Sequence, residues 1–413
     1  MTQTTNRVGD MMGAQPPSSC PPSCSVEIGP PGTDEWRALN ARARAGCMFL
    51  SPDWLEPWWK HFGGGRELQT ICVREGGKLI GILPLFAERI ALGGVPVTRI
   101  AFLGDGDTGC DYLDALAAPG REREVLDHCL AALMNLNWDV CDLDGLWRES
   151  FTAGQIVSRF APSRPTGGVV RDSRLRFVCP NFPLTGTYES YLQGLSRREN
   201  LKRREKWLFR QPGVSIACAR TPREATKATE EFLELHRARW AVEGGSNGLS
   251  DASHEAFHRE ASQRLARTGG LRMYTLYAAR RPVASVYGVV HGGKFNYYQS
   301  GYDPNWASRS VGLVLLAKTV SDAFAEGHQE FDFLRGNEGY KGEWARGERW
   351  TIQLRLWRGI RGRTARQALS ASLFARETIK AALPKDALAG MRKARRILQA
   401  SGPKGLFKIL QEP

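Results

Sequence analysis

Two neighbouring stretches decide the fold: Tyr297–Leu316, YYQSGYDPNWASRSVGLVLL, and Glu330–Ala345, EFDFLRGNEGYKGEWA. The first predicts the end of a strand, a loop and a helix that begins near Ser310. The second predicts a short apolar strand that runs into a glycine-containing turn. A strand, a helix and a further strand in this order are typical of a mixed α/β sheet. The start of the helix offers free backbone N–H groups, which together with the helix dipole favour a bound pyrophosphate.

The segments around these stretches repeat one order of elements. In residues 35–146 a pair of helices is followed by a three-strand meander, a helix and a strand. The same order recurs in residues 221–359. Recurrence without obvious sequence identity indicates a duplicated fold. We therefore expect an α/β (α+β) protein with two similar domains, each a mixed sheet flanked by helices.

These patterns divide the 413 residues of the chain into four parts. Residues 1–33 contain PPSSCPPSC and GPPG with almost no apolar periodicity, so we expect a disordered leader. Residues 34–180 and 181–358 are the expected N-terminal and C-terminal domains. Residues 359–413 are basic, with Leu, Ile and Phe recurring at helical spacing, which predicts an amphipathic helical tail. Such a tail can pack on the protein's own surface, stay solvated or lie on anionic lipid.

The formal net charge is +14, and the surplus of Lys and Arg lies in the second half and the tail. This indicates either an anionic partner or a generally arginine-rich protein. The nine Cys residues are scattered and odd in number, which favours a reducing cytoplasm over a disulfide framework. Cys20 and Cys24 have C-x3-C spacing, but no later Cys/His pair at ligand spacing completes a metal site, so no metal is expected. The sequence predicts neither a signal peptide nor a membrane span, and hence a cytoplasmic protein, or a peripheral one held on the inner face of the membrane by its tail.

The two opening stretches resemble the CelD-like branch of the GNAT acyltransferase superfamily, a group associated with cellulose and exopolysaccharide production. The runs FLSPDWLEPWWKHF at 49–62, LIGILPLF at 79–86 and GDGDTGCDYLDAL at 104–116 match the same branch. The similarity covers about residues 35–358, and proteins of this branch are similar in build to the Fem peptidoglycan aminoacyltransferases. The resemblance implies two tandem GNAT-like domains, a degenerate first one and a second one that uses acyl-CoA, with acetyl-CoA as the expected donor.

The resemblance also implies a position for the donor. GNAT domains hold the acyl-CoA pyrophosphate on an R-x-x-G-x-G/A turn, which here corresponds to residues 309–314. The expected donor contacts are Arg309, Ser310, Val311, Gly312 and Leu313. Val314 stands where the turn carries a small residue, so its side chain is expected to narrow the approach. The first domain lacks such a turn near Gly120.

Direct acyl transfer needs a base, a proton donor for the leaving thiolate and a donor for the tetrahedral oxyanion, and it needs no metal. Asp332 lies between Phe331 and Phe333, and apolar neighbours of this kind raise the pKa of a carboxyl group, so Asp332 is a candidate base. Its alternative roles are to cap the following turn or to pair with Arg335. Glu338 is a second candidate base.

Tyr340 and Lys341 follow the GNEG turn, which places them at the mouth of the same cleft. We predict that Tyr340 protonates the leaving group and that Lys341 binds a phosphate or steadies the oxyanion; an aromatic that only packs and a solvated lysine are the alternative. Asp111 is predicted to act on the acceptor from the first domain. Asp105 and Asp107, in the same loop as Asp111, are expected in a solvated acidic turn.

Lys202 and Arg204 belong to a basic run, residues 197–206, with helical spacing. Such a run is either a solvated helix face or a grip for the phosphates of a nucleotide-sugar, a lipid-pyrophosphate carrier or a tRNA. Together with Tyr298 and Gln299, at the end of the strand before residue 310, they are the predicted substrate contacts. The sequence contains no motif for sequence-specific nucleic-acid binding.

The expected function is transfer of an acyl group from acyl-CoA to an amine or hydroxyl of a saccharide, or of a nucleotide-linked or lipid-linked sugar. The resemblance connects this reaction with exopolysaccharide, cellulose or cell-envelope biosynthesis. One alternative is Fem-like aminoacyl transfer from charged tRNA. The second domain lacks the long helical insertion of the Fem relatives, and this argues against that alternative. Another is a non-catalytic protein that docks on a membrane-bound polysaccharide synthase.

Overall fold

The computed structural model describes residues 24–161, 168–243, 249 and 251–382. The N-terminal half contains β1 (Cys24–Ile28), α1 (Thr33–Arg42), η1 (Met48–Leu50), α2 (Pro52–Phe62), β2 (Glu67–Leu68), β3 (Ile71–Glu75), β4 (Lys78–Leu83), β5 (Leu85–Leu92), β6 (Val95–Phe102), β7 (Leu116–Ala117), α3 (Glu122–Asn135), β8 (Val140–Trp147) and α4 (Phe151–Arg159). The chain continues with β9 (Val170–Pro183), α5 (Tyr188–Gln193), α6 (Arg198–Leu208), β10 (Ser215–Ala219), α7 (Pro222–Glu243), α8 (Ala252–Arg267), β11 (Leu271–Ala278), β12 (Arg281–His291), β13 (Lys294–Tyr302), η2 (Pro304–Arg309), α9 (Val311–Ala325), β14 (Glu330–Asp332), α10 (Gly339–Trp344), β15 (Gly347–Trp357) and α11 (Gly359–Ala382). We call α5 to α10 the C-terminal half.

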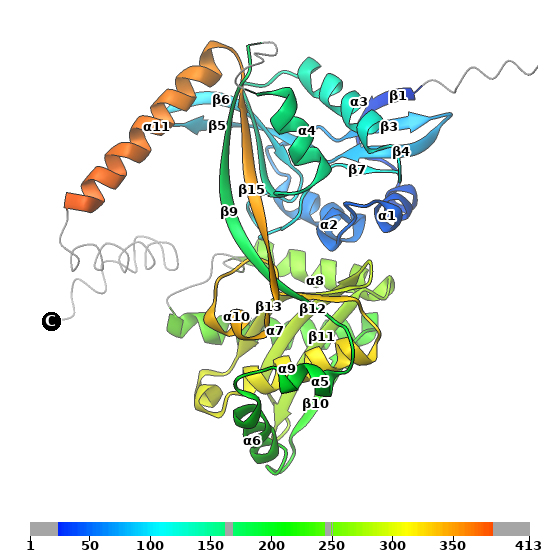
Figure 1. Cartoon of the computed structure of the whole chain (residues 1–413), viewed down its shortest axis with the longest axis vertical. Helices are drawn as coiled ribbons and strands as arrows, with labels where there is room; N and C mark the ends of the chain where they lie inside the picture. Colours follow the sequence, from blue (N-terminus) through cyan, green and yellow to red (C-terminus); the bar gives the residue numbers. More distant parts are fainter. Residues whose placement is uncertain (1–23, 162–167, 244–248, 250, 383–413) are drawn as a thin grey trace, which may run out of the picture.

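Two long strands join the halves (Figure 1). β9 and β15 pair antiparallel and continue from one half into the other, so that an 11-stranded sheet runs in the order β10-β11-β12-β13-β14-β9-β15-β8-β6-β5-β2. A separate four-stranded sheet, β1-β3-β4-β7, completes the N-terminal half. The predicted mixed α/β architecture with flanking helices is thus present in both halves. The predicted boundary at residue 180 lies inside β9, a strand that both halves share.

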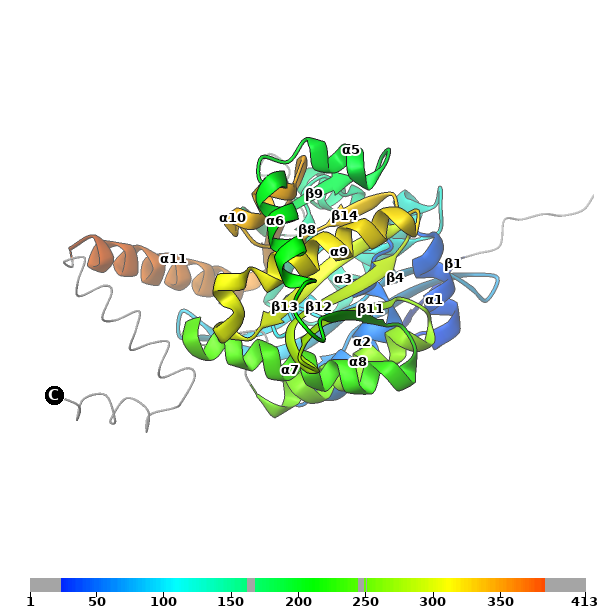
Figure 2. The same cartoon turned by 90° about the horizontal axis from the view of Figure 1, so that it is seen from below.

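The core of the C-terminal half lies on both faces of its sheet (Figure 2). Helices α5, α6 and α9 cover one face, where Phe331 and Phe333 are buried against α9. Helices α7 and α8 cover the other face, and α8 also packs against α2 of the N-terminal half. Trp54 and Trp58 of α2 are fully buried, so the aromatic residues of that helix belong to the core.

The prediction of a disordered leader over residues 1–33 is wrong for its last part. Residues 24–28 form β1, which pairs antiparallel with β3 from Cys24 opposite Glu75 to Ile28 opposite Ile71. Backbone hydrogen bonds to the edge of a sheet hold this segment, and Val26 and Ile28 stay exposed, which is why apolar periodicity gave no signal. Residues 1–23 lie outside the described part of the chain.

The tail begins as helix α11, as its periodicity predicts. Its first turns pack on the protein's own surface, because Ala365 is buried and Arg366 forms an ion pair of 2.8 Å with Asp172 of β9. Farther along, Phe374 is 77% exposed, and the helix extends away from the body (Figure 1). Residues 383–413 lie outside the described part, and lipid contact stays a prediction. None of the helices described here is long and apolar enough to cross a membrane.

Strands β13 and β14 create the opening in the sheet. They pair in parallel only from Lys294 opposite Glu330 to Asn296 opposite Asp332, and beyond this point they separate. At the same place a bulge shifts the register of β13 against β12, with Tyr298 as the extra residue. Parallel strands that diverge leave a cleft between them, and the following helix α9 begins beside β13. The predicted strand, helix and strand therefore surround one opening.

Candidate active site

A pocket of about 130 Å³ lies where β13 and β14 diverge, and we call it the transfer pocket. Its walls come from β13, from the segment after β14, from α7 and from a loop of the N-terminal half. The lining residues are Thr108, Gly109, Asp111, Arg239, Trp240, Tyr297, Tyr298, Gln299, Ser300, Leu334, Arg335, Glu338, Tyr340 and Lys341. Six predicted site residues therefore meet here: Asp111, Tyr298, Gln299, Glu338, Tyr340 and Lys341.

The segment that follows β14 and forms one wall of the pocket has a strained backbone. Leu334 has a φ of 54°, a left-handed conformation that costs a residue with a side chain of order 1–3 kcal/mol. Gly336 also has a positive φ, and a Cβ at this position would collide with the side chains of Glu338 and Lys341. Lys341 Nζ donates to the backbone oxygen of Arg335 at 2.7 Å and lies 3.1 Å from Glu338 Oε2. The turn therefore folds over a buried ammonium group and holds it at the pocket wall.

Tyr340, the predicted proton donor, lines this pocket. Burial raises the pKa of its phenol well above the ordinary value, and the neighbouring Tyr297 adds to the shift. Burial also raises the pKa of Tyr297, with which Tyr340 interacts. Because the phenol of Tyr340 keeps its proton at neutral pH, it can give that proton to a developing thiolate.

Asp111, in the N-terminal half, forms hydrogen bonds with Arg335 of the C-terminal half. Its side chain is fully buried, and its two carboxylate oxygens accept from the backbone N–H and the Nε of Arg335 at 2.8 and 2.7 Å. The Arg335 guanidinium also lies 4.2 Å from the centre of the Phe177 ring of β9. Asp111 thus positions Arg335 at the pocket wall, and a direct action of Asp111 on the acceptor stays a prediction.

Asp332 lines neither the transfer pocket nor the pocket of about 280 Å³ that is described below. Burial raises its pKa to about 6, in the predicted direction. Its Oδ1 accepts the N–H of Leu334 at 2.7 Å, which is the turn-capping role considered above. Its Oδ2 accepts the hydroxyl of Tyr112 at 2.9 Å and lies 3.2 Å from Arg349 Nη1. The pairing of Asp332 with Arg335 did not form, because Arg335 is held by Asp111, and the role of Asp332 as a base stays a prediction.

The predicted donor contacts surround the start of α9. Ser310 is the N-cap residue with a φ of 57°, but its side chain makes no capping hydrogen bond, so it leaves the first N–H groups of the helix to a ligand. A Cβ added at Gly312 meets nothing within 4 Å, which shows open space at this turn. Val314 is 1% exposed and packs into the core. The expectation that Val314 narrows the approach is therefore wrong, because its side chain points to the other side of the helix.

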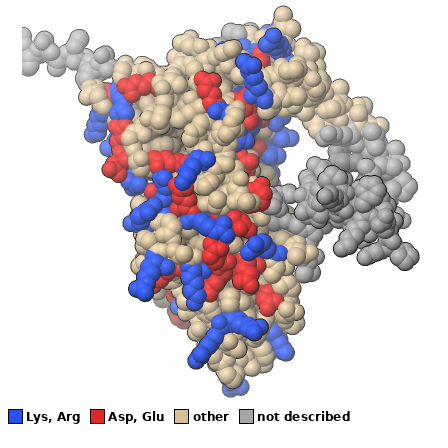
Figure 3. Space-filling model, turned by 180° about the vertical axis from the view of Figure 1, so that it is seen from behind, with Lys and Arg blue, Asp and Glu red and all other residues tan. Residues whose placement is uncertain are grey.

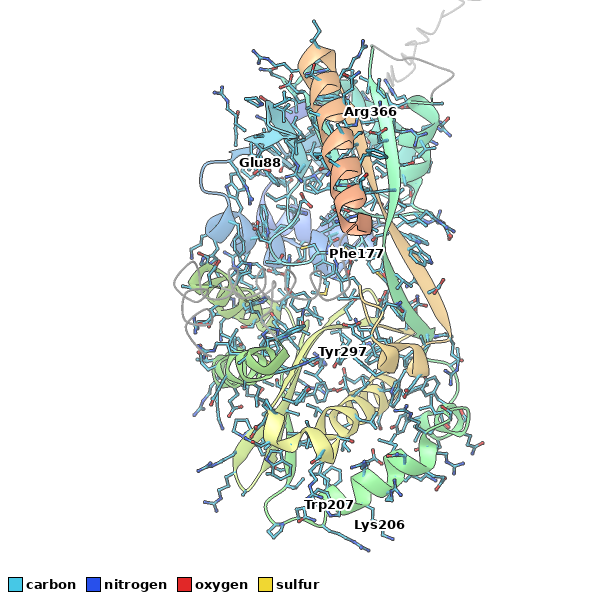
Figure 4. All side chains as sticks on the ribbon, turned by 90° about the vertical axis from the view of Figure 1, so that its left-hand side faces the viewer. Glu88, Phe177, Lys206, Trp207, Tyr297 and Arg366 are labelled. Atoms are coloured by element: carbon cyan, nitrogen blue, oxygen red, sulfur yellow. The ribbon has the colours of Figure 1, made fainter. Side chains whose placement is uncertain are left out.

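Helix α6 brings positive charge to the same place. Arg204 Nη1 donates to the backbone oxygen of Ser308 at 2.8 Å, and the guanidinium of Arg309 lies 4.5 Å from the ring centre of Trp207. Lys202 is exposed, 3.8 Å from Glu199. Figure 4 shows Trp207 at the far end of the C-terminal half and Tyr297 nearer the junction of the halves. Arg204 thus lies beside residues 309–314, which we call the donor turn. Neither Arg204 nor Lys202 lines the transfer pocket.

A second and larger pocket, of about 280 Å³, lies between the halves on the other side of residues 111–112. Tyr112 lines it, has a φ of 60° and reaches Asp332 through its hydroxyl. Trp147 and Phe151 provide aromatic surface, and positive charge comes from Lys294 of β13 and Arg349 of β15. The pocket therefore offers both aromatic faces and polar groups to a ligand.

The carboxyl group of Asp114 lies at the buried end of this larger pocket. Burial raises its pKa to about 6, against the opposing effect of the Thr152 and Ser150 hydroxyls. The native state therefore keeps this proton up to about pH 6, whereas the unfolded chain releases it near the ordinary value of 3.8. Such a group stabilises the fold less and less as the pH rises between these two values.

We expect Asp114→Asn to remove this pH dependence. Asparagine does not titrate, so the unfolding free energy of the variant, relative to that of the parent, should rise by about 2.4 kcal/mol between pH 4 and pH 7. Urea unfolding of both proteins at pH 4, 5, 6 and 7 measures this difference in unfolding free energy. A difference that stays constant over this range would contradict the raised pKa.

Sequence reasoning missed eight of the fourteen lining residues of the transfer pocket: Thr108, Gly109, Arg239, Trp240, Tyr297, Ser300, Leu334 and Arg335. Thr108 lies in the acidic loop that contains Asp107 and Asp111, and the backbone oxygen of Thr108 accepts a hydrogen bond from the hydroxyl of Tyr298 at 2.7 Å. Arg239 and Trp240 belong to a predicted helix, but helical periodicity does not tell which partner a face meets. Arg335 was considered only as a partner of Asp332.

A family model for the acetyltransferase (GNAT) domain matches residues 196–342. This range contains the start of α9 and every lining residue of the transfer pocket from α7, β13 and the segment after β14. Domains of this family use acyl-CoA. The N-terminal half lies outside the match.

Two solved structures with TM-scores above 0.5 have the same fold, and a third is similar with a lower score. FemX is 11% identical, with a TM-score of 0.55 over 78% of this chain and 96% of FemX. A conserved protein of unknown function from Bacteroides thetaiotaomicron is 11% identical, with a TM-score of 0.51 over 81% of this chain and 100% of that protein. A tandem GNAT protein from the clavulanic acid biosynthesis pathway is 15% identical, with a TM-score of 0.42 over 80% and 98% of the two chains. No curated protein sequence gave a significant match.

The family match covers both structural features described above: the opening between β13 and β14, and the start of α9 with its unpaired N–H groups. The finer resemblance to the CelD-like branch has no support in these comparisons. The chain contains an acetyltransferase (GNAT) domain over residues 196–342 and is an acyltransferase of the GNAT type.

Proposed function

We propose that this protein transfers an acyl group, acetyl in the simplest case, from acyl-CoA to an amine or hydroxyl of a saccharide or of a nucleotide-linked or lipid-linked sugar. The proposal includes the CelD-like connection with exopolysaccharide, cellulose or cell-envelope biosynthesis. The observation that carries it is the transfer pocket, which lies at the divergence of β13 and β14 and is closed by residues 108–111 of the N-terminal half.

The donor turn suits the pyrophosphate of the donor. The N–H groups of Val311, Gly312 and Leu313 have no partner within α9, since the first intrahelical bond of the helix runs from Val314 N to Ser310 O. Anionic oxygens are favoured there by these donors and by the helix dipole. The guanidinium groups of Arg309 and Arg204 add positive charge beside the same turn.

In this proposal, different residues in or beside the transfer pocket act as the base, the oxyanion donor and the proton donor of the reaction. The acceptor nitrogen or oxygen attacks the thioester carbonyl, and its proton passes to a base, for which Glu338 at the pocket wall and the buried Asp332 are the candidates. The ammonium of Lys341 stabilises the oxyanion. When the C–S bond breaks, Tyr340 gives its proton to the sulfur. No covalent enzyme intermediate is needed.

The saccharide part of the proposal rests on the space between the halves. Thr108, Gly109 and Asp111 bring the N-terminal half to the reacting end of the transfer pocket. The larger pocket beyond Tyr112 has aromatic surface at Trp147 and Phe151, against which the apolar face of a sugar ring packs. It gives room for a further unit of the acceptor.

Calorimetric titration with acetyl-CoA and with CoA tests the donor. Binding at micromolar concentration is expected, followed by release of free thiol when glucosamine or a nucleotide-linked amino sugar is added. Absence of binding at millimolar concentration of either ligand would overturn the acyl-CoA proposal. Binding of acetyl-CoA without thiol release on any sugar would overturn the saccharide part alone.

Fem-like aminoacyl transfer is a second candidate, favoured by the basic face of α6 beside the donor turn. It requires binding of charged tRNA that weakens steeply with salt. On the face shown in Figure 3, basic and acidic side chains are interspersed over the middle of the molecule, which does not favour a long polyanion there. A non-catalytic partner of a polysaccharide synthase is the third candidate, and it requires that Tyr340 and Lys341 be replaceable without loss of phenotype.

Tyr340→Phe should lower the turnover of acyl transfer by about 10²–10⁴-fold, because the leaving thiolate loses its proton donor. The affinity for CoA should not change, since the hydroxyl acts only on the breaking bond. Tyr277→Phe is the matched control: the Tyr277 hydroxyl donates to Glu231 of α7, and Tyr277 lines neither of the two pockets described above. Equal turnover of the two variants would contradict the role of Tyr340.

A further inference from the structure

Three side chains with metal-ligand chemistry meet at the edge of the N-terminal half, and none of them lines the transfer pocket. Cys24 belongs to β1, and Glu124 and His128 belong to α3. One possible ligand atom from each, a sulfur, a carboxylate oxygen and an imidazole nitrogen, lies within 4.8 Å of the other two. The Cys24 thiol already donates to Glu124 Oε1 at 3.2 Å.

The fold sets this arrangement. Glu124 and His128 are four residues apart in a helix, so they share one face of α3. β1 is added to the edge of β3 and thereby brings Cys24, opposite Glu75, to that face. The positions are 100 residues apart in the chain, which is why spacing in the sequence showed no partners for Cys24.

Arg121 holds the carboxylate in place. Its Nε donates to Glu124 Oε2 at 2.6 Å, and its two terminal nitrogens donate to Glu75 at 2.9 and 2.8 Å. A hydrogen-bonded carboxylate of this kind is typical of metal ligands, whose partners orient them. Arg121 also lowers the pKa of Glu124 to about 2, so the ligand oxygen is ionised.

The ligand set selects the metal. A thiolate, an imidazole and a carboxylate suit zinc, at bond lengths of about 2.0–2.3 Å. Tetrahedral ligands at these lengths stand about 3.5 Å apart, which the cluster reaches with small side-chain rotations. Burial raises the pKa of the Cys24 thiol, and a bound cation would reverse this shift by taking the thiolate. The thiolate and the carboxylate together offset the charge of a divalent ion.

We propose that Cys24, Glu124 and His128 bind a zinc ion that fastens β1 to α3. The site would be structural: it closes the edge of the four-stranded sheet and lies apart from the acyl-transfer residues, so it does not depend on the proposed function. The fourth position belongs to water.

The test measures zinc in the purified full-length protein, without any affinity tag, after equilibration with zinc and dialysis. About one zinc per chain is expected, and Cys24→Ser and His128→Ala should each lose it, with affinity weakened more than about tenfold. Cys218→Ser and His328→Ala are matched controls, since these residues lie in the C-terminal half and should leave the zinc content unchanged.

Cobalt substitution gives a second readout that does not depend on stability. A sulfur-to-cobalt charge-transfer band is expected in the parent and in Cys218→Ser, and it should be absent in Cys24→Ser. Removal of zinc by a chelator should lower the melting temperature of the parent and leave that of Cys24→Ser unchanged. If the parent binds no zinc, or if both ligand variants retain zinc and the cobalt band, the proposal is overturned.

Discussion

Asp111→Ala should lower the free energy of unfolding by about 3–5 kcal/mol, one of the two largest effects that we expect from a single change. The carboxylate of Asp111 is fully buried and accepts both the N–H and the Nε of Arg335. Removal of this carboxylate leaves the guanidinium in a partly buried position without its counter-charge. The two residues belong to different halves, so the loss also loosens the wall of the transfer pocket.

Urea unfolding at neutral pH, monitored by tryptophan fluorescence, measures this loss. Asp127→Ala is the matched control, because Asp127 is exposed on α3 and lies 3.4 Å from Arg159. Exposed pairs of this kind contribute at most about 1 kcal/mol. If Asp111→Ala proves as stable as the control and loses only turnover, Asp111 acts on the acceptor and the positioning role is wrong.

Gly312→Trp should weaken the binding of CoA by about 100-fold or more, with little change in stability. Space is open around Gly312, so an indole ring can be placed there without a clash inside the protein. The ring would then cover the N–H groups at the start of α9. Loss of two charge-assisted hydrogen bonds, each of about 1.5 kcal/mol, corresponds to roughly that factor.

Calorimetric titration of the variant with CoA gives the ratio. Gly154→Trp provides the control, since Gly154 is also a helical glycine with nothing within 4 Å of an added Cβ, but lies on α4 of the N-terminal half. Equal affinity of both variants would show that the donor does not lie on α9. Loss of affinity in both would indicate a general effect of the added tryptophan.

Local patterns predicted the parts of this protein that depend on neighbours in the chain. Apolar periodicity predicted α7, α8, β11 to β13, α9 and β14 in their observed order. The raised pKa of Asp332 followed from its place between Phe331 and Phe333. By contrast, Asp105 was expected in a solvated turn and instead pairs with Arg99 of β6, and burial raises its pKa to about 6. The acidic loop gave no sign of this, because the partner lies in another element.

The sequence by itself determined the mixed α/β class and the helix that begins at residue 311, since each depends on residues within one or two turns of one another. The predicted duplication of the order of elements is wrong for the N-terminal half, where the strands between α2 and α3 are β2 to β7, divided between two sheets, instead of one three-strand meander. Only the tertiary structure decided what the two halves share: the paired strands β9 and β15, and the contact of Asp111 with Arg335 across 224 positions. It also decided that Cys24 meets Glu124. Residues so far apart have no common periodicity, and their pairing is fixed only by the packing of the whole chain.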